Sequence, residues 1–556
     1  MARNGAGGKW ATAAILLALA ALHFALVAGL PVWLLGRTAL DDALYLRNAQ
    51  HLASGEWLGP YDHRTLARGP FFPAFLAMCS RAGVPIRAAQ SALYLAAGLL
   101  LLFSVHPWPG PRWMRLAAFG AYAFDPMLYH VDLLRVAREG VYVPLTVLVL
   151  GLCAASLRAR DAPLPLRLGW AVLLGSALGS FWLTREEGPW ILPALACGAI
   201  ALAAARCGRQ PGARAALGRD AAVLALAAGV AFACVELVSW QNHRHYGTWT
   251  AVEFRQDAFE RAYGALLRID PAQRVPFVPV TRAALRRAAA VSPAAAKIAA
   301  VLASGAKDGY ARYGCEYHRL DPCDNEFRGG WFMFALRDAV ALAGHYASGA
   351  EAERFYAKLA EEIDAACAAQ RLACGPPRRG LAPPLAPSEV RAIAANALRA
   401  AADVARFAGF ELSPEPSTVS APDFARDAAF LHSRAFARGE SAPDEFADSG
   451  DRLRAAVLRA VADEYRWTTA PLALAAAVAL AWALRRGLRA LAVSWVAVAA
   501  MLAVAVLSRA ALVSAVSTTS IPILIPRYLA PAYPPLLLFA GIGVAGGLGA
   551  TRNRRR

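Results

Sequence analysis

Two adjacent carboxylates, Asp41 and Asp42, follow the first long apolar segment of the chain. Neighbouring carboxylates repel each other, which raises the pKa of one of them or attracts a cation. One member of such a pair can act as a general base, and carboxylate oxygens suit Mg²⁺ or Mn²⁺. The same two residues also suit a helix start, where they cap backbone amides and complement the helix dipole. From the sequence alone, catalysis and helix capping are both open.

Arginines recur where other apolar segments begin or end, at Arg135, Arg138, Arg185 and Arg527. A guanidinium pairs bidentately with phosphate oxygens, so Arg138 and Arg527 are the main candidates for phosphate binding. Arg135 and Arg185 are secondary candidates of the same kind. The alternative is that these side chains extend towards lipid headgroups at the membrane surface.

Three more side chains in these segments could touch a substrate: Glu139, Glu186 and Tyr45. Glu139 could hold an acceptor or a metal, or it could begin a helix as a carboxylate favoured by the dipole. Glu186 could contact the substrate or form a solvated cap. Tyr45 could offer an aromatic face to a sugar, or it could belong to an aromatic belt at the membrane interface.

The composition limits which elements can position these residues. The 556-residue chain is 58% hydrophobic and 18% charged, with a mean hydropathy of +0.38. Soluble domains carry about 25% charged residues and about 45–50% apolar ones, so the composition does not favour an ordinary cytosolic protein. A disordered chain is excluded, because disorder requires low hydrophobicity. The net charge of +18 would fit a nucleic-acid partner only if the basic residues shared one surface.

Ten apolar segments are candidates for membrane-spanning helices, several of them short, since about 20 apolar residues cross a hydrocarbon layer of about 30 Å. They lie near 10–35, 88–105, 113–131, 141–157, 168–183, 188–205, 221–240, 469–484, 490–508 and 528–549. The sequence therefore predicts an all-α polytopic membrane protein with about ten transmembrane helices.

Arginines in the short loops predict the orientation, because basic residues collect on the cytoplasmic side. With the N-terminus inside, the inside loops and tails hold 18 basic residues and only two acids, Asp161 and Asp220. We therefore expect a multi-pass protein of a bacterial inner membrane with both termini cytoplasmic. Most of the net charge then faces the lipid surface, and no nucleic-acid partner is expected.

A large polar insert separates the seventh and eighth predicted spans. We expect an N-terminal membrane domain over 1–240, a mainly α-helical periplasmic domain over 241–468, and a C-terminal membrane domain with a basic tail over 469–556. Four cysteines lie in the insert at close spacing, Cys315 with Cys323 and Cys367 with Cys374. In an oxidising periplasm these spacings favour two local disulfides over a metal site.

The order of these motifs resembles the GT-C glycosyltransferase superfamily, in particular the branch of protein O-mannosyltransferases and lipid A aminoarabinose transferases. The matching features are the acidic pair after the first span, a Ser-Gly helix end at 54–55, and Gly69-Pro70-Phe71-Phe72-Pro73. Arg138-Glu139-Gly140, the 184–188 segment and the 526–534 segment complete the pattern. The likeness covers 1–240 and 469–548.

The resemblance implies an inverting transfer of a sugar from a polyprenyl-phosphate donor to a hydroxyl of a lipid, glycan or protein acceptor. By motif position, Asp41 resembles the general base of the family, and Asp42 resembles its neighbour, which positions the donor or a metal. If a divalent cation is bound, Asp41, Asp42 and Glu139 are its expected ligands, with Mg²⁺ or Mn²⁺ as the ion.

The main alternative function is a transporter or flippase for a lipid or envelope precursor. Such proteins place ionisable residues or broken helices near the middle of the membrane. The predicted spans hold few charges there: Asp125 and Glu236 are exceptions, and both fall towards an outer end. A membrane-anchored binding protein whose insert does the work is a third alternative.

Overall fold

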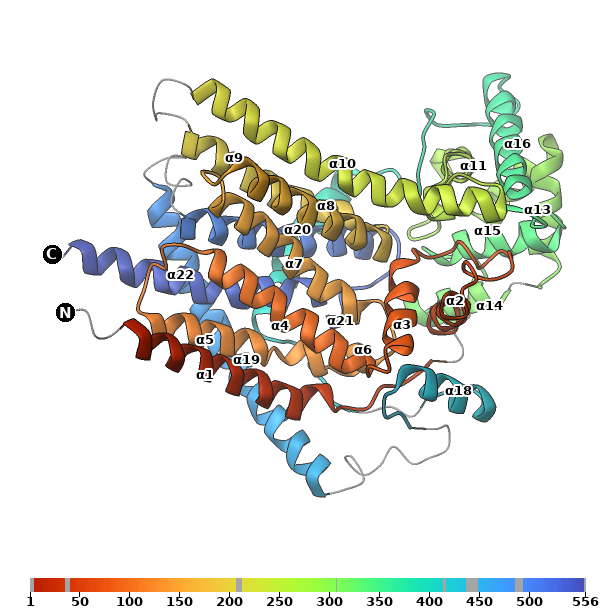
Figure 1. The fold of residues 1–556 in the computed structure, drawn as a ribbon. Helices are drawn as coiled ribbons and strands as arrows, with labels where there is room; N and C mark the ends of the chain where they lie inside the picture. Colours follow the sequence, from red (N-terminus) through yellow and green to blue (C-terminus); the bar gives the residue numbers. More distant parts are fainter. Residues whose placement is uncertain are drawn as a thin grey trace.

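Helices account for nearly all of the regular structure in the computed structural model, which describes residues 5–35, 41–206, 213–306, 308–413, 417–436, 449–485 and 494–554. The β-contacts among these residues are isolated bridges. Figure 1 shows a bundle of long helices in which the start of α1 (Gly5–His23) and the end of α22 (Tyr533–Arg554) lie at one end. Most helices of the insert, between residues 257 and 368, lie at the other end. The all-α prediction is confirmed.

Nine helices within the described residues are long and apolar enough to cross a membrane. They are Trp10–Ala28, Ile86–Ser104, Glu139–Arg158, Leu164–Thr184, Gly188–Arg206, Ala215–Tyr246, Gly450–Leu484, Ser494–Thr519 and Pro526–Ala550. Each corresponds to one of the ten predicted spans, so the polytopic architecture is confirmed and one predicted span is missing.

The missing span is 113–131, where the prediction of one continuous helix is wrong. The segment forms three short helices: α5 (Arg112–Ala123), η2 (Pro126–Tyr129) and α6 (Val131–Leu134). The break follows from Asp125 and Pro126. Proline lacks the amide that a continuing helix needs, and the Asp125 carboxylate accepts a hydrogen bond from the Met127 amide at 3.0 Å instead.

The ninth predicted span, 490–508, extends further than expected. Helix α20 (Ser494–Thr519) continues past Arg509, which the prediction placed in a loop. Hydroxyls at 508, 518 and 519 donate to the carbonyls four residues earlier at 2.7, 2.8 and 2.8 Å. These bonds pair the hydroxyls with carbonyls of the same helix, so the polar side chains can lie within the helix without interrupting it.

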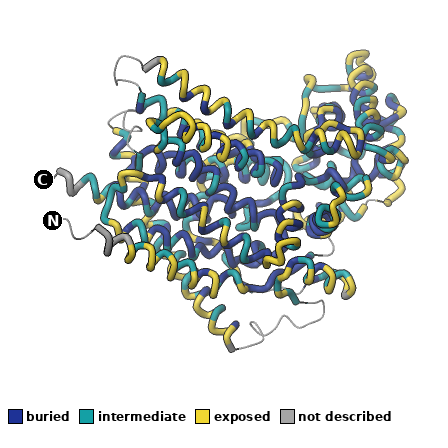
Figure 2. Tube along the Cα trace, in the orientation of Figure 1, coloured by how far each residue is buried: buried dark blue, intermediate teal, exposed yellow. Residues whose placement is uncertain are grey.

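Burial differs sharply among the spanning helices, as Figure 2 shows. Helix α7 (Glu139–Arg158) and the span that ends in α22 are largely enclosed by other helices. Helices α1 and α10 (Ala213–Tyr246) have mostly exposed apolar side chains. The exposed apolar faces fit a lipid surrounding, and the enclosed helices carry the residues described below.

The insert is helical, as predicted. Its helices are α11 (Asp257–Leu267), α12 (Arg282–Val291), α13 (Pro293–Ala303), α14 (Asp308–His318), α15 (Trp331–Leu342), α16 (Gly349–Ala368), α17 (Pro387–Ala405) and α18 (Ala421–Leu431). The first loop contributes Leu44 and Ala67 to the buried core of the insert. This shared core fixes the segment after α1 against the insert.

Candidate active site

The acidic pair divides into two different environments at the start of α2 (Asp42–Ser54). Neither carboxylate caps the helix: Asp41 occupies the N-cap position, but its side chain makes no capping hydrogen bond. Asp42 is buried, whereas the Asp41 side chain is 24% exposed. The adjacent residues therefore have different surroundings and different chemical capacities.

Asp42 is held by Arg135, the residue after α6. The Arg135 Nε donates to both carboxylate oxygens at 2.9 and 3.0 Å, and Nη2 donates to Oδ1 at 2.6 Å. The backbone amide of Leu35, after α1, donates to Oδ2 at 2.9 Å. Asp42 thus ties the exit of the first span to α6, and its oxygens are already occupied.

Asp41 pairs with Arg68, the residue before the Gly69-Pro70 motif, which the sequence did not lead us to propose as a site residue. The Arg68 Nη2 donates to Asp41 Oδ1 at 3.0 Å, and Arg135 Nη2 lies 3.9 Å from Oδ2. Burial alone would raise the pKa of Asp41. The charges of Arg68 and three further arginines outweigh this effect and lower the pKa to about 2. Asp41 is therefore ionised at neutral pH.

Arg138 and Glu139 point to two different partners at the start of α7. The Arg138 Nη1 pairs with Glu186 at 3.0 Å. Glu139 is 1% exposed and lies between two arginines. Its Oε1 is 2.7 Å from Arg185 Nη1 and 3.1 Å from Arg527 Nε. The structure thus joins α7, the segment after α8 (Leu164–Thr184) and α21 (Pro526–Leu529).

Glu187 and Arg509 complete this group, and sequence reasoning did not include them in the site. The Glu187 Oε1 lies 3.0 Å from Arg185 Nε and 2.6 Å from Arg509 Nη1. Burial acts to raise the pKa of Glu187. The nearby arginines, Arg185 and Arg509 foremost, outweigh this effect and lower the pKa to about 2. The available signal for Arg509 was an arginine directly after a predicted apolar span.

We call the resulting group the site cluster: Asp41, Asp42, Glu139, Glu186, Glu187, Arg68, Arg135, Arg138, Arg185, Arg509 and Arg527. Six arginines face five carboxylates, which leaves one surplus positive charge. The cluster contains every charged residue that the sequence analysis proposed for the site. A small anion is the ligand that this balance favours.

Tyr45 lies near the cluster on the first turn of α2. Its ring packs edge-on against Phe72, with centroids 5.2 Å apart. Its hydroxyl is buried and has no hydrogen-bond partner among the described residues. Burial is the main reason that its pKa lies above the ordinary value, while Arg138 opposes the shift. The phenol stays protonated and can donate a hydrogen bond to a ligand that reaches it.

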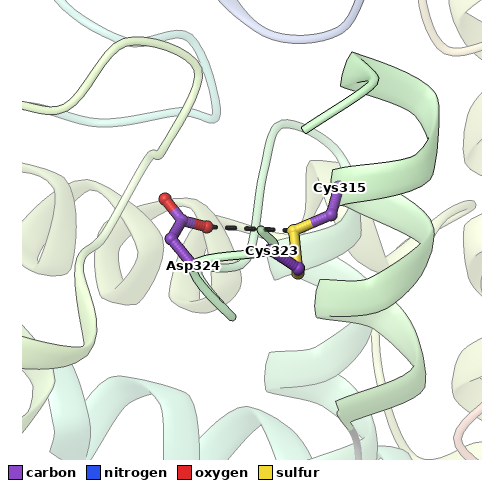
Figure 3. A group of neighbouring side chains, drawn as sticks. All are labelled: Cys315, Cys323 and Asp324. Carbon is purple, nitrogen blue, oxygen red and sulfur yellow. Dashed lines mark hydrogen bonds between the residues drawn. A yellow bond between two sulfur atoms is a disulfide. The ribbon is translucent and has the colours of Figure 1, made fainter. Parts of the chain in front are cut away.

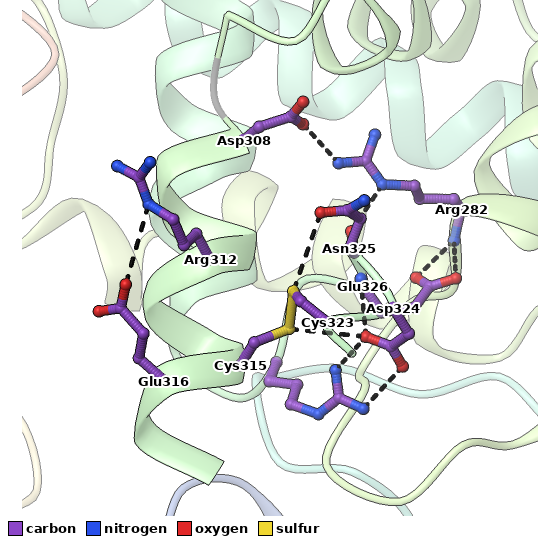
Figure 4. The surroundings of a disulfide bond; sticks show 10 residues. Arg282, Asp308, Arg312, Cys315, Glu316, Cys323, Asp324, Asn325 and Glu326 are labelled. Carbon is purple, nitrogen blue, oxygen red and sulfur yellow. Dashed lines mark hydrogen bonds and ion pairs between the residues drawn. A yellow bond between two sulfur atoms is a disulfide. The ribbon is translucent and has the colours of Figure 1, made fainter. Parts of the chain in front are cut away.

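The four insert cysteines form the two predicted disulfides, Cys315–Cys323 with an S–S distance of 2.04 Å and Cys367–Cys374 with 2.01 Å. Figure 3 shows Asp324 next to the first of them. These sulfurs are bonded to each other and offer no thiolate, so this trio does not suit a metal ion. Figure 4 shows the ion pair of Arg282 and Asp308 near the same disulfide. In this pair Arg282 Nη2 lies 2.7 Å from Asp308 Oδ1.

No family model matches the chain, and no curated protein sequence is significantly similar to it. Two solved structures are similar, both of ArnT from Cupriavidus metallidurans, one in the apo state and one bound to undecaprenyl phosphate. Each is 15% identical, and the match covers 91% of this chain and 78% of the other. The TM-scores are 0.30 and 0.28, so the function has to be argued from the side chains.

Proposed function

We propose that this chain is a membrane glycosyltransferase that moves a sugar from a polyprenyl-phosphate donor to an acceptor hydroxyl. The observation that carries the proposal is the site cluster: a buried surplus of arginines around one partly exposed, ionised carboxylate, Asp41. The arginines suit the phosphate of a lipid donor, and the carboxylate suits proton removal from the acceptor.

Three arginines are our candidates for contact with the phosphate, because their side chains keep some exposure. Arg68 is 12% exposed, Arg138 10% and Arg527 13%. Arg185 and Arg509 are 2% and 0% exposed and have supporting roles instead. Charge develops on the phosphate oxygen as the sugar departs, and fixed guanidinium groups in a dry site stabilise it.

The transfer step uses Asp41 as the base. The acceptor oxygen attacks the anomeric carbon, its proton passes to Asp41, and the bond between that carbon and the phosphate oxygen breaks. The electron pair leaves with the phosphate, so attack from the opposite face inverts the anomeric centre. The negative charge of a bound phosphate also offsets the effect of the arginines on Asp41. This raises the pKa of Asp41 from about 2 towards its ordinary value and makes it a better proton acceptor.

A divalent cation does not fit the expected ligands, Asp41, Asp42 and Glu139. The oxygens of Asp42 are taken by Arg135 and a backbone amide, and those of Glu139 by Arg185 and Arg527. A Mg²⁺ or Mn²⁺ ion would have to displace arginines and sit among their charges. We therefore propose a transfer in which arginines neutralise the donor phosphate.

We further propose that the insert lies on the outer side of a bacterial inner membrane. Two features support this: the insert carries both disulfides, and arginines fill the short loops at the opposite end of the bundle. The donor sugar and the acceptor then meet at the outer surface of the membrane, where the site cluster lies beside the insert. The N-terminus and C-terminus are cytoplasmic in this arrangement.

The test compares envelope glycans and lipid-linked sugars in cells that lack the gene and carry the wild type, Asp41→Asn or Asp161→Asn. Asp161 is also paired with arginine, but it lies at the opposite end of the bundle and its side chain is 67% exposed. We expect Asp161→Asn to restore the missing glycan. Asp41→Asn should lower its formation by about 10²- to 10⁴-fold, the range for a general base.

Binding of purified protein to undecaprenyl phosphate completes the test and separates the transferase from a flippase. A transferase with Asp41→Asn should still bind this lipid while the sugar donor accumulates in the cells. A full amount of product with Asp41→Asn, in protein that inserts normally, would contradict the transferase and favour movement of an intact lipid.

A further inference from the structure

Arg509 is an arginine buried inside a membrane-spanning helix. It lies in α20, ten residues before the helix ends at Thr519, or about 15 Å along the axis. Its side chain is 0% exposed. A charge enclosed by helices is costly unless it is paired, and such residues are retained when they do work inside the bundle. The transfer step above assigns Arg509 no contact with substrate.

The contacts of Arg509 hold it from several sides. Its Nη1 lies 2.6 Å from Glu187 Oε1, and its Nε donates to the Tyr528 carbonyl at 2.8 Å. The guanidinium faces the rings of Trp190 and Tyr142, with centroids 5.4 and 5.9 Å away. Arg509 therefore contacts both the loop after α8, through Glu187, and the short helix α21, through the Tyr528 carbonyl.

Both contacts lead to Arg527. The direct path is short, because the carbonyl that Arg509 holds belongs to the residue after Arg527. The second path alternates in charge: Glu187 lies 3.0 Å from Arg185, which lies 2.7 Å from Glu139, which lies 3.1 Å from Arg527. This series of ion pairs begins at Arg509, whose side chain is 0% exposed, and ends at Arg527, whose side chain is 13% exposed.

We propose that Arg509 is a positioning residue that sets the direction of Arg527 and thereby the affinity of the site for a lipid phosphate. This inference rests on the proposed function. Arg509 holds the backbone of α21 on one side, and through Glu187, Arg185 and Glu139 it holds the carboxylate that orients the Arg527 guanidinium. It acts at a distance from the phosphate and contributes no contact to it.

A lysine at position 509 keeps the charge but loses the geometry. Arginine has several donors in a planar fork, whereas a lysine ammonium is a compact point charge. We expect Arg509→Lys to pair with Glu187 and release the Tyr528 carbonyl. The affinity for undecaprenyl phosphate should then fall by about fivefold to twentyfold, less than for the loss of a direct charged hydrogen bond to the phosphate, because Arg527 keeps its charge.

The experiment is a double-mutant cycle on the purified full chain, with undecaprenyl phosphate as the probe. Its variants are Arg509→Lys, Arg527→Gln and the double variant. If Arg509 acts through Arg527, the double variant binds no more weakly than Arg527→Gln alone. Arg167→Lys is the matched control, since Arg167 is also a buried arginine of the bundle, 2.5 Å from Asp220, and should bind like the wild type.

Glu187→Gln gives a second route if Arg509→Lys fails to fold, because it breaks the same chain at the next link. It should show the same lack of additivity with Arg527→Gln. Additive losses in both cycles, or wild-type affinity in Arg509→Lys, would overturn the positioning role alone. If the wild type shows no saturable binding, the proposed function fails together with the inference.

Discussion

The two ends of helix α8 carry two clusters of arginines with the same charge surplus and different surroundings. Arg185, directly after α8, belongs to the site cluster. Arg167, in the first turn of α8, lies at the other end, about 27 Å away along the axis. There Arg160, Arg167 and Arg206 face Asp161 and Asp220, at distances between 2.5 and 3.4 Å. We call these five residues the opposite-end cluster.

Burial distinguishes the two clusters. In the opposite-end cluster Asp161 is 67% and Arg160 23% exposed, so water and salt screen these charges. Arg167 and Asp220 form a buried pair there, 10% and 3% exposed. In the site cluster the most exposed carboxylate, Glu187, is 29% exposed, and Asp42 and Glu139 are 1% exposed. One surplus positive charge is weak in water and strong in a dry site. The same residue types therefore anchor a loop at one end and are suited to bind a phosphate at the other.

The largest expected difference is in stability, between Asp42→Asn and Asp161→Asn. Asp42→Asn leaves Arg135 buried without its partner charge, which lowers the free energy of unfolding by about 3–5 kcal/mol. Asp161→Asn breaks a solvated pair and costs about 1 kcal/mol or less. Equilibrium unfolding in mixed micelles measures both. Equal losses would contradict the distinction between the clusters.

The second difference is in phosphate affinity, between Arg527→Gln and Arg206→Gln. A hydrogen bond to a charged group contributes about 1.5–3 kcal/mol, so Arg527→Gln should weaken undecaprenyl phosphate binding by about tenfold to a hundredfold. Arg206→Gln removes the same charge from the opposite-end cluster and should leave the affinity unchanged. Titration of the purified variants measures both. A loss of affinity in Arg206→Gln would indicate that the lipid phosphate binds at the opposite-end cluster and would contradict its binding at the site cluster.

A third and opposite effect is expected for Asp41→Asn. Removing this carboxylate releases Arg68 and raises the surplus charge of the site cluster by one. The affinity for undecaprenyl phosphate should rise by about threefold to tenfold, while sugar transfer is lost. Asp161→Asn is the control, and its affinity should not change. Weaker binding in Asp41→Asn would contradict this charge argument and show that Asp41 holds Arg68 in the orientation that the phosphate needs.

The pH dependence of binding should follow the ligand. A phosphate monoester loses its second proton near pH 6, and its dianion binds arginines more strongly than its monoanion. The arginines stay protonated, and Asp41, with a pKa of about 2, stays ionised. Affinity for undecaprenyl phosphate should therefore rise by a few-fold, about twofold to fivefold, between pH 5 and pH 7.5. A fall over this range would point to a titrating group in the protein.

The smallest expected effect is that of a chelator. If arginines alone neutralise the phosphate, EDTA should leave the affinity for undecaprenyl phosphate unchanged. Added Mg²⁺ should not strengthen it. Recovery of lost affinity by Mg²⁺ or Mn²⁺ after EDTA would restore the metal role expected for Asp41, Asp42 and Glu139.

Sequence reasoning found the residues of the site more easily than their partners. Asp41, Arg138 and Glu139 were recognisable because each follows or precedes an apolar run. Their contacts were not, because Arg68 and Arg527 lie far from them in the chain and meet them only in the folded bundle. Arg509 was missed for a related reason: hydropathy ended the predicted span at the first charge, whereas enclosure by other helices lets α20 continue.

Hydropathy and cysteine spacing are local properties, so they were enough to predict the all-α membrane architecture, the nine of the ten proposed spans that the described residues confirm, and the two disulfides. The sequence by itself left the acidic pair open between capping and catalysis. Tertiary structure assigned Asp42 to a buried pair with Arg135 and left Asp41 partly exposed beside Arg68. It also decided which arginines lose their water, and burial, which no local pattern encodes, sets how strongly a charge acts.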